Sequence, residues 1–545
     1  MARTVATVIA ESLAAAGISH AFCVPGESYL PLLDAMRDVA VRLVTCRHEA
    51  SAAHMAEAAG KLSGRPGVAM VTRGPGASQA LIGLHTAQQD STSLLLVVGQ
   101  VGDDAIGREA FQEMDYHRLF GSVAKRVVTL REPDRAGEQV AAALSCASSG
   151  RPGPVVLVLP DDRLALPSES AVHAPAPVAA PAPAPQAMAE LAHLLAAAER
   201  PVLVLGGPGW CEADSTRATE VAERLGLPVV TSWRRKDRFD NCHPNYGGEL
   251  GLGACPALLK AVKACDLLLV VGARLTENET HGYTLLDPGF AATRLVHACA
   301  DPDALGRTWQ PRLAIHAATG PMLAALAELP PRARPDWVAR FAAIHADWTR
   351  PTEVRAGVNP AEVMAALSDR LGPEAIIASG AGNFAAWVHR FTRHRRLGTQ
   401  LAPVSGAMGY GVPAGIAAAL LRPDRPVACI AGDGDFLMAA AELATAVHEG
   451  ARLIFLVMDN GQYGTIRMHQ ARDFPGRPSA TALTNPDFAA LARSFGLHGE
   501  TVRDTAAFAP ALERCLAALE RRPALIHCRT DPDEIAPGRR LEKDA

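Results

Sequence analysis

Short apolar runs alternate along the chain with longer stretches in which apolar residues recur at helical spacing. Runs such as GVAMVT, SLLLVVG and GPVVLVLP, and later VLVLGG, DLLLVVG and LIFLVM, have the length of buried strands. Strands that are apolar on both faces are typical of parallel sheets covered by helices on each side. The pattern therefore predicts an α/β protein built from doubly wound parallel sheets.

The alternation falls into three blocks, and a Pro-rich segment separates the first from the second. We predict an N-terminal domain over residues 1–165, a Pro/Ala-rich linker over 166–187, a central domain over 188–335 and a C-terminal domain over 355–535. Prolines in the linker remove backbone donors and favour extended chain, so we expect it at the surface. The length of 545 residues agrees with three cores, since one domain usually takes roughly 100–200 residues.

Composition argues against several other classes of protein. A net charge of −4 gives no electrostatic reason to expect nucleic acid or an anionic membrane as partner. The start, MARTVATVIAESLAAAG, reads as an amphipathic helix rather than a signal peptide, and no window has the apolar length of a membrane span. The 11 cysteines are scattered without a Cys-x-x-Cys pair, which predicts neither a disulfide framework nor a zinc site. We expect a cytoplasmic protein.

Two polar motifs follow apolar strands of the third block. Asp433 lies in GDGDF after one strand, and Asn460 lies in DNGQYG after the next. In a right-handed strand–helix–strand unit both residues emerge at the carboxyl edge of one sheet. Carboxylate and amide oxygens suit Mg²⁺, and Gly432 and Gly434 let backbone amides approach a phosphate. Either motif alone is a common turn former, but the pair predicts a magnesium-bound diphosphate.

This pair resembles the signature of thiamine-diphosphate enzymes of the acetolactate synthase type, which is Gly-Asp-Gly, a helix and an Asn-Asn-like pair. The resemblance covers almost the whole chain, and it implies that the N-terminal domain binds the pyrimidine and the C-terminal domain the diphosphate. It implies thiamine diphosphate and Mg²⁺ as cofactors, with Asp433, the Asn460 side chain and the main-chain carbonyl of Gln462 as metal ligands. Asp459 departs from the commoner Asn, but it is not an expected ligand.

Glu49 is the activating acid that the resemblance implies. It lies in RHEASAAHM, before GPGAS, where the family places a glutamate against N1′ of the aminopyrimidine. A carboxylate there favours the imino tautomer, which takes the proton from thiazolium C2. Taken alone, Glu49 is also compatible with a first-turn acid that complements a helix dipole. A non-catalytic cofactor-binding subunit would be expected to lack it.

Further segments resemble the family's cofactor cradle. In VSGAMGYGVPAG, the carbonyl of Gly406 would accept from the aminopyrimidine and Met408 would lie between the rings, although such a Met is otherwise usually core filler. The cofactor-binding set that the resemblance implies is Glu49, Asn383, Phe384, Gly406, Met408, Gly432, Asp433, Gly434, Asp435, Asn460, Gln462 and Gly464. In this family the cofactor lies between two subunits, which implies a homodimer or a homotetramer.

The substrate pocket is less defined by the sequence. GREAFQEMD resembles the segment that lines this pocket in acetolactate synthase, which nominates Phe111 and Gln112, and Gln112 also as a catalytic residue. Further pocket candidates, each also compatible with an ordinary surface or structural role, are Pro25, Gly26, His48, Arg467 and His469.

Three positions depart from acetolactate synthase. Asp161 stands in place of a lysine, Asn278 in place of an arginine that would hold a second substrate carboxylate, and His469 in place of a tryptophan. Because arginine is the side chain suited to bidentate carboxylate recognition, these changes alter which acceptor can bind.

The resemblance implies an enzyme acting on 2-oxo acids, aldehydes or related acyl donors. Loss of CO₂ from a 2-oxo acid on the cofactor gives an enamine, which is protonated or adds to another carbonyl. The leading prediction is a carboligase or decarboxylase, a transferase or lyase that is acetolactate synthase-like. The alternatives are a C–C lyase with a different donor and, less favoured, a flavin or nicotinamide oxidoreductase, which leaves Asp433 and Asn460 without a role. FAD in the central domain is an option that we do not favour.

Overall fold

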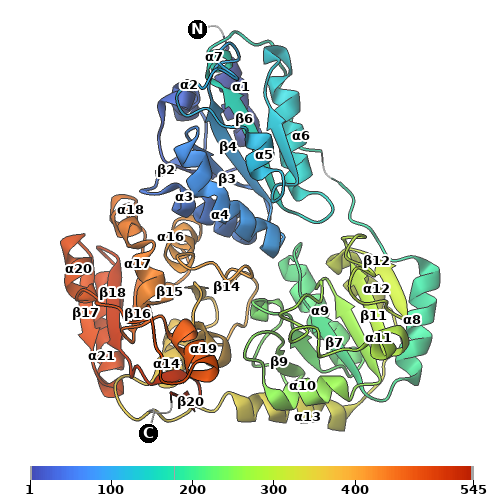
Figure 1. Ribbon diagram of the computed structural model, residues 1–545. Coiled ribbons are helices and arrows are strands. Elements are labelled where there is room, and N and C mark those ends of the chain that lie inside the picture. The colour runs from blue at the N-terminus through green and yellow to red at the C-terminus, as the bar shows by residue number, and fades with distance from the viewer. Residues whose placement is uncertain (1–2, 177, 542–545) are drawn as a thin grey trace.

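Three six-stranded parallel sheets, each covered by helices, form the main body of the described part of the chain. The computed structural model describes residues 3–176 and 178–541. The three domains stand at the corners of a triangle, with the N-terminal domain at the top, the central domain at lower right and the C-terminal domain at lower left (Figure 1). This arrangement confirms the predicted fold class.

The N-terminal sheet has the strand order β2-β1-β3-β4-β6-β5. Its strands are β1 (His20–Cys23), β2 (Arg42–Thr45), β3 (Gly67–Val71), β4 (Leu94–Gln100), β5 (Arg126–Thr129) and β6 (Pro154–Pro160). Its helices are α1 (Val5–Ala15), α2 (Leu30–Ala35), α3 (Glu49–Ser63), α4 (Pro75–Asp90), α5 (Tyr116–Phe120), α6 (Ala136–Ser148) and α7 (Asp161–Leu164). Leu94 and Leu96 of β4 enter the core on one face and Leu95 the core on the other, because successive side chains of a strand point to opposite faces.

The central sheet has the order β12-β11-β10-β7-β8-β9. Its strands are β7 (Pro201–Leu205), β8 (Val229–Thr231), β9 (Tyr246–Glu249), β10 (Leu267–Val271), β11 (Leu295–Cys299) and β12 (Leu313–His316). Its helices are α8 (Pro185–Ala197), α9 (Glu212–Arg224), α10 (Pro256–Lys263), α11 (Pro288–Arg294), α12 (Thr319–Ala327) and α13 (Pro335–Trp348).

The C-terminal sheet has the order β14-β13-β15-β16-β18-β17, and a short hairpin of β19 and β20 follows it. The strands are β13 (Ile376–Ser379), β14 (Gln400–Leu401), β15 (Val427–Gly432), β16 (Ile454–Asp459), β17 (His498–Val502), β18 (Ala524–Arg529), β19 (Glu534–Ala536) and β20 (Arg539–Arg540). The helices are α14 (Pro360–Leu371), α15 (Phe384–Phe391), α16 (Gly411–Leu421), α17 (Asp433–Leu437), α18 (Leu443–His448), α19 (Gly464–Asp473), α20 (Phe488–Ser494) and α21 (Phe508–Ala518).

The segments between the sheets bear on the predicted domain boundaries, which stay predictions. Residues 168–176 and 178–184 form no helix or strand, and α8 begins at Pro185 within the predicted linker. Residue 177 of the linker lies outside the described residues. Helix α13 lies almost entirely in the stretch that the predicted boundaries leave unassigned, and its Trp337 and Phe341 pack into the central core.

The N-terminal and C-terminal domains share one continuous core. Helix α3 of the first domain packs against α16 of the third, and alanines of both helices belong to one buried cluster. Small side chains let the two helix backbones approach closely, since no bulky group separates them. The Ala-rich stretches therefore join the two domains tightly within one chain.

A buried polar network joins all three domains near that core. The carboxylate of Asp90 on α4 lies 3.0 Å from Lys61 Nζ of α3 and 3.0 Å from Arg235 Nη2 of the central domain. The backbone N–H of Val404 in the C-terminal domain donates to the same carboxylate at 2.9 Å, and Lys61 also pairs with Glu57 at 3.0 Å. Burial alone would raise the pKa of Asp90, but Lys61 and Arg235 hold it below the ordinary value. Each charge of the network therefore depends on its partners.

Candidate active site

Asp433 and Asn460 lie at the carboxyl ends of two neighbouring parallel strands. Gly432 at the end of β15 is in register with Met458 of β16, so the two turns that follow stand side by side. Asp433 is buried, and its Oδ2 accepts the backbone N–H of Gly461 at 2.9 Å. Burial raises the pKa of Asp433 to about 6. The structure thus brings the two predicted motifs into direct contact.

Asp459, at the end of β16, is occupied by protein donors. Its carboxylate accepts from His527 Nε2 at 2.8 Å, from Arg529, and from Asn485 Nδ2 at 2.9 Å. Burial alone would raise the pKa of Asp459, but these hydrogen bonds and the Arg529 charge hold it well below the usual range. Sequence reasoning missed His527, Arg529 and Asn485, because none of them lies in a recognisable motif.

A cavity of about 750 Å³ opens between the C-terminal and central domains beside these turns. Its lining includes Trp233, Leu252 and His281 of the central domain. The predicted residues that line it are Asn383, Phe384, Gly406, Met408, Gly432, Asp433, Gly434, Asp435, Asn460, Gln462, Gly464 and His469. Arg467 lies on α19 with His469 but does not belong to this lining.

At two glycines in the loops around this cavity, close packing leaves no room for a larger side chain. A Cβ at position 434 would stand 2.5 Å from the ring of Tyr463, and one at position 432 would stand 2.8 Å from the ring of Phe384. The backbone of the Gly-Asp-Gly turn therefore lies against its aromatic neighbours with no intervening side chain.

Asp435 joins the loops behind the cavity. Its Oδ1 accepts the backbone N–H of Gly409 at 2.8 Å and that of Ala381 at 3.3 Å. Burial raises the pKa of Asp435 to about 7, and its Oδ2 has no hydrogen-bond partner among the described residues. An orphaned buried oxygen beside a cavity is the kind of group that a bound ligand satisfies.

The remaining predicted residues gather at the carboxyl edge of the N-terminal sheet. Pro25 and Gly26 follow β1, His48 and Glu49 follow β2, and Phe111 and Gln112 follow β4. Glu49 begins α3 and is half-buried, whereas the Phe111 side chain is 75% exposed. The structure therefore forms two groups of predicted residues, one on this edge and one around the large cavity.

Close contacts define the surroundings of Glu49. A Cβ at Gly76 would stand 3.2 Å from Glu49 Oε1, and one at Gly74 would stand 2.8 Å from the backbone oxygen of Gln112. Gln112 itself has a φ of 64°, a conformation that is uncommon for a residue other than glycine and that concentrates at functional sites. The edge therefore places Glu49 against the GPG turn, with Gln112 held close to the same turn.

Glu442 of the C-terminal domain anchors the loop that carries Glu49. Its Oε1 accepts the backbone N–H of Arg47 at 3.0 Å and that of His48 at 3.1 Å. His48 in turn caps α3, with Nδ1 accepting from Ala50 N at 3.1 Å. Burial raises the pKa of Glu442 above its ordinary value. Sequence reasoning missed Glu442, since it lies in a helical stretch without a motif.

Asp161 has a partner of its own at this edge. Its Oδ2 lies 3.2 Å from Nη1 of Arg73, whose Nη2 lies 3.1 Å from Glu27 Oε1. The acidic replacement at this position is therefore matched by a cation from the loop before the GPG turn.

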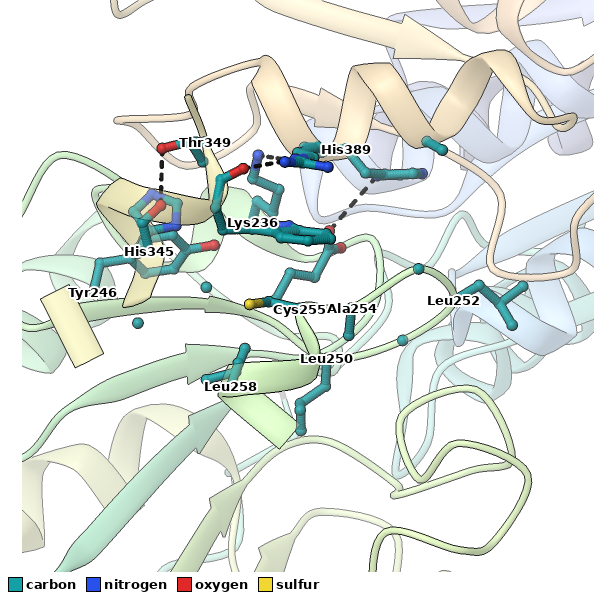
Figure 2. Close-up of a pocket in the computed structure, with 18 residues that line it drawn as sticks. Lys236, Tyr246, Leu250, Leu252, Ala254, Cys255, Leu258, His345, Thr349 and His389 are labelled. Carbon is teal, nitrogen blue, oxygen red and sulfur yellow. Dashed lines mark hydrogen bonds and ion pairs between the residues drawn. The ribbon is translucent and has the colours of Figure 1, made fainter. Parts of the chain in front are cut away.

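Figure 2 shows a second, smaller cavity of about 50 Å³. It adjoins the large one, with which it shares Leu252, Trp348 and His389. Both ring nitrogens of His389 are buried without a hydrogen-bond partner among the described residues. The nearest carboxylate is that of Glu249, whose Oε2 lies 3.7 Å from Nδ1. Burial raises the pKa of Glu249 to about 7 and lowers the pKa of Lys236 to about 8. This cavity has room for a few water molecules but not for a cofactor.

Within the described residues, no helix combines the length and the apolar character needed to cross a lipid bilayer.

Comparison with protein families finds three matches in chain order. Residues 3–119 match the thiamine pyrophosphate enzyme N-terminal TPP binding domain, residues 188–326 the central domain, and residues 380–528 the C-terminal TPP binding domain.

Curated relatives are similar to the chain along nearly its whole length. It is 34% identical to the acetolactate synthase large subunit of Parasynechococcus marenigrum, over 95% of this chain and 86% of that protein. It is 30% identical to the acetolactate synthase isozyme 2 large subunit of Escherichia coli, over 96% of this chain and 95% of that protein. It is also 30% identical to the probable acetolactate synthase large subunit of Methanocaldococcus jannaschii, over 98% and 94% respectively.

The family matches agree with the three sheets and with the two groups of predicted residues. The N-terminal match ends at residue 119, just after the edge that carries Glu49 and Gln112, and the C-terminal match spans the turns of Asp433 and Asn460. The motif-based resemblance is confirmed: the chain belongs to the thiamine pyrophosphate enzyme family and is an acetolactate synthase-like member that depends on thiamine diphosphate.

Proposed function

We propose that the large cavity holds thiamine diphosphate through Mg²⁺. The Asp433 carboxylate, the Asn460 carbonyl and the main-chain oxygen of Gln462 would be the protein ligands, since Mg²⁺ prefers oxygen donors and keeps phosphate oxygens in its shell. The observation that carries the proposal is the contact between the Asp433 and Asn460 turns on the wall of a cavity lined by glycine-rich loops. The orphaned Oδ2 of Asp435 supports a bound group at this place.

We further propose that the enzyme decarboxylates 2-oxo acids or related acyl donors and joins the acyl unit to a second carbonyl. The bound thiazolium would supply the electron sink for breaking the bond next to the carbonyl. Glu49 would hold a proton at N1′ of the aminopyrimidine, and the Gly406 carbonyl would accept from its amino group. Met408 would support the bent cofactor, and Gln112 with Phe111 would orient substrate.

We propose that these roles are shared between two copies of the chain. The large cavity is lined by the central and C-terminal domains, whereas Glu49 lies on the edge of the N-terminal sheet. We propose a homodimer, or a homotetramer built from such dimers, in which Glu49 of one subunit faces the cavity of the other. We also propose a cytoplasmic location, since all eleven cysteines are free, as is usual in a reducing compartment.

A C–C lyase that uses a different donor is the second candidate. It is favoured by the replacements at Asp161, Asn278 and His469, because a site that lacks the arginine loses its bidentate donor for a second carboxylate. We do not favour FAD, since the GGPGW and GARL segments of the central domain are only a weak signal for a flavin site. Absorbance of the purified protein in the flavin bands tests this choice.

A substrate screen tests the reaction. Purified protein with thiamine diphosphate and Mg²⁺ is incubated with 2-oxo acids, alone and with aldehydes, and CO₂ release and product mass are measured together. A carboligase releases CO₂ and forms a product that combines two substrates, whereas a lyase cleaves a C–C bond without needing a 2-oxo acid. Bound cofactor with no turnover of any 2-oxo acid would contradict the leading proposal.

Two variants test the residue roles. Glu49→Gln should keep thiamine diphosphate binding while C2 proton exchange falls steeply. Glu27→Gln, which changes an exposed acid on the same sheet edge, is the matched control. Unchanged exchange in Glu49→Gln would remove its assigned role. Asp433→Ala should abolish magnesium-dependent retention of the cofactor, and full retention after chelation would overturn the metal assignment.

A further inference from the structure

Asn485 lies beside the carboxylates of Asp433 and Asp459, and backbone hydrogen bonds hold the segment that carries it. The N–H of Tyr463 donates to the Thr481 oxygen at 2.8 Å, and the N–H of Leu483 donates to the Gly461 oxygen at 2.8 Å. These two bonds fasten residues 481–483 alongside the metal turn. The segment is also fixed downstream, because Asp487 caps α20. Asn485 therefore has little freedom to leave its place.

The amide of Asn485 joins the two carboxylates. Its Nδ2 donates to Asp433 Oδ2 at 2.6 Å and to Asp459 Oδ1 at 2.9 Å. The N–H of Gly461 lies between the same two oxygens, 2.9 Å from the first and 3.0 Å from the second. Two carboxylates this close repel one another, so these donors are what keeps them together. Asp433 Oδ2 is thereby occupied, which leaves Oδ1 for a cation.

The orientation of the amide follows from its neighbours. Turning the amide over would place its carbonyl oxygen against both carboxylates, so Nδ2 must face them. The cost of this arrangement is visible, since Asn485 Oδ1 is buried without a hydrogen-bond partner among the described residues. An amide kept at such a position despite an orphaned oxygen indicates that its two donated hydrogen bonds matter.

We propose that Asn485 is a positioning residue that sets the pose of Asp433 for the metal. It ties Asp433 to Asp459, which is itself held by His527 and Arg529 at the end of β18. Groups that orient metal ligands typically change metal affinity by about 10- to 100-fold when removed. The proposal rests on the proposed function of Asp433 as a metal ligand. Asn485 lies in the segment TNPDF, which reads as a turn followed by a helix N-cap, so the sequence gives no sign of this role.

Binding of Mn²⁺, which replaces Mg²⁺ and is visible by electron paramagnetic resonance, tests the proposal on the full-length protein with thiamine diphosphate. Asn485→Ala should raise the Kd for Mn²⁺ by about 10- to 100-fold. Asn485→Ser, which keeps one donor, should give a smaller increase. Thr484→Ala changes the exposed neighbouring side chain and should leave the Kd unchanged. The far-UV circular dichroism of the metal-free variants should match the wild type, which separates positioning from a general loss of structure. Their thermal midpoint should fall modestly, because the two carboxylates lose a shared donor.

The outcomes separate this inference from the function on which it rests. Wild-type protein that binds no Mn²⁺ with thiamine diphosphate would overturn the proposed function itself. Wild-type binding together with an unchanged Kd in both Asn485 variants would overturn the role of Asn485 alone. If Asn485→Ala fails to fold, the Kd of Asn485→Ser relative to Thr484→Ala decides the question.

Discussion

Asp90→Asn is the substitution for which the structure predicts the clearest consequence outside the cavity. The side chain of Asp90 is fully buried and meets Lys61, Arg235 and the N–H of Val404, one from each domain. Asparagine keeps the shape and one acceptor oxygen but removes the charge. Lys61 retains Glu57 at 3.0 Å, whereas the remaining acceptors of Arg235 are backbone carbonyls.

The magnitude follows from the cation that is left unpaired. Removing one partner of a buried ion pair costs about 3–5 kcal/mol, and the low end applies here because only Arg235 loses its counter-charge. If the closed contact between the N-terminal and C-terminal domains is destabilised by about 3 kcal/mol, the two domains separate roughly 100-fold more often. The amides of α3 and α16, which pack across the junction, should report it.

Hydrogen exchange followed by mass spectrometry measures this opening segment by segment. Peptides covering α3 and α16 should exchange about 100-fold faster in Asp90→Asn, while peptides from β17 at the far edge of the C-terminal sheet keep their rates. Asp347→Asn is the matched control, since its pair with Arg350 is exposed on both sides and contributes about 0–1 kcal/mol. Asp90→Asn combined with Arg235→Met should recover much of the loss, because no unpaired cation remains. Equal exchange in Asp90→Asn and Asp347→Asn would refute the reasoning.

The remaining predictions concern the two edges and the small cavity. Glu442→Ala should speed hydrogen exchange of residues 46–50 by about tenfold or more, because two backbone N–H groups lose their acceptor at a cost of about 1–3 kcal/mol. Unchanged exchange in these residues would show that other contacts hold the loop. Glu249 has a raised pKa, so the folded state binds more protons than the unfolded state between pH 4.5 and about 7, and stability falls as pH rises through that range. In the wild type, the free energy of unfolding should fall by at most about 3 kcal/mol between denaturation curves at pH 5 and pH 8, and Glu249→Gln should remove this fall. The same dependence on pH in the wild type and the variant would contradict the prediction. Gly434→Ala should weaken binding of thiamine diphosphate in a fluorescence titration, because the new methyl group meets Tyr463 at 2.5 Å and the turn must move at a cost of about 1–3 kcal/mol; wild-type affinity would contradict it.

Motifs at strand ends could be read from the sequence because their geometry is local. The turn after an apolar strand emerges at the carboxyl edge of a parallel sheet, so the order of strands and turns along the chain is enough to place Asp433 and Asn460 together. The family resemblance, rather than this geometric argument, nominated Glu49 and Gln112, which the structure places on the edge of the first sheet. Glu442 and Asn485 could not be found this way, since each acts on a loop distant in sequence through one or two hydrogen bonds.

By itself the sequence determined the three parallel sheets, the family and the residue types of the cofactor turns, because strand burial and Gly-Asp-Gly turns depend on neighbours within a few residues. Only the tertiary structure decided how the domains join, with Asp90 paired to Arg235 and α3 packed on α16. It also decided that Asp459 is held by Asn485, His527 and Arg529 rather than left open to a ligand. Such contacts depend on chain segments brought together by packing, and no local pattern records which distant donor will meet which buried charge.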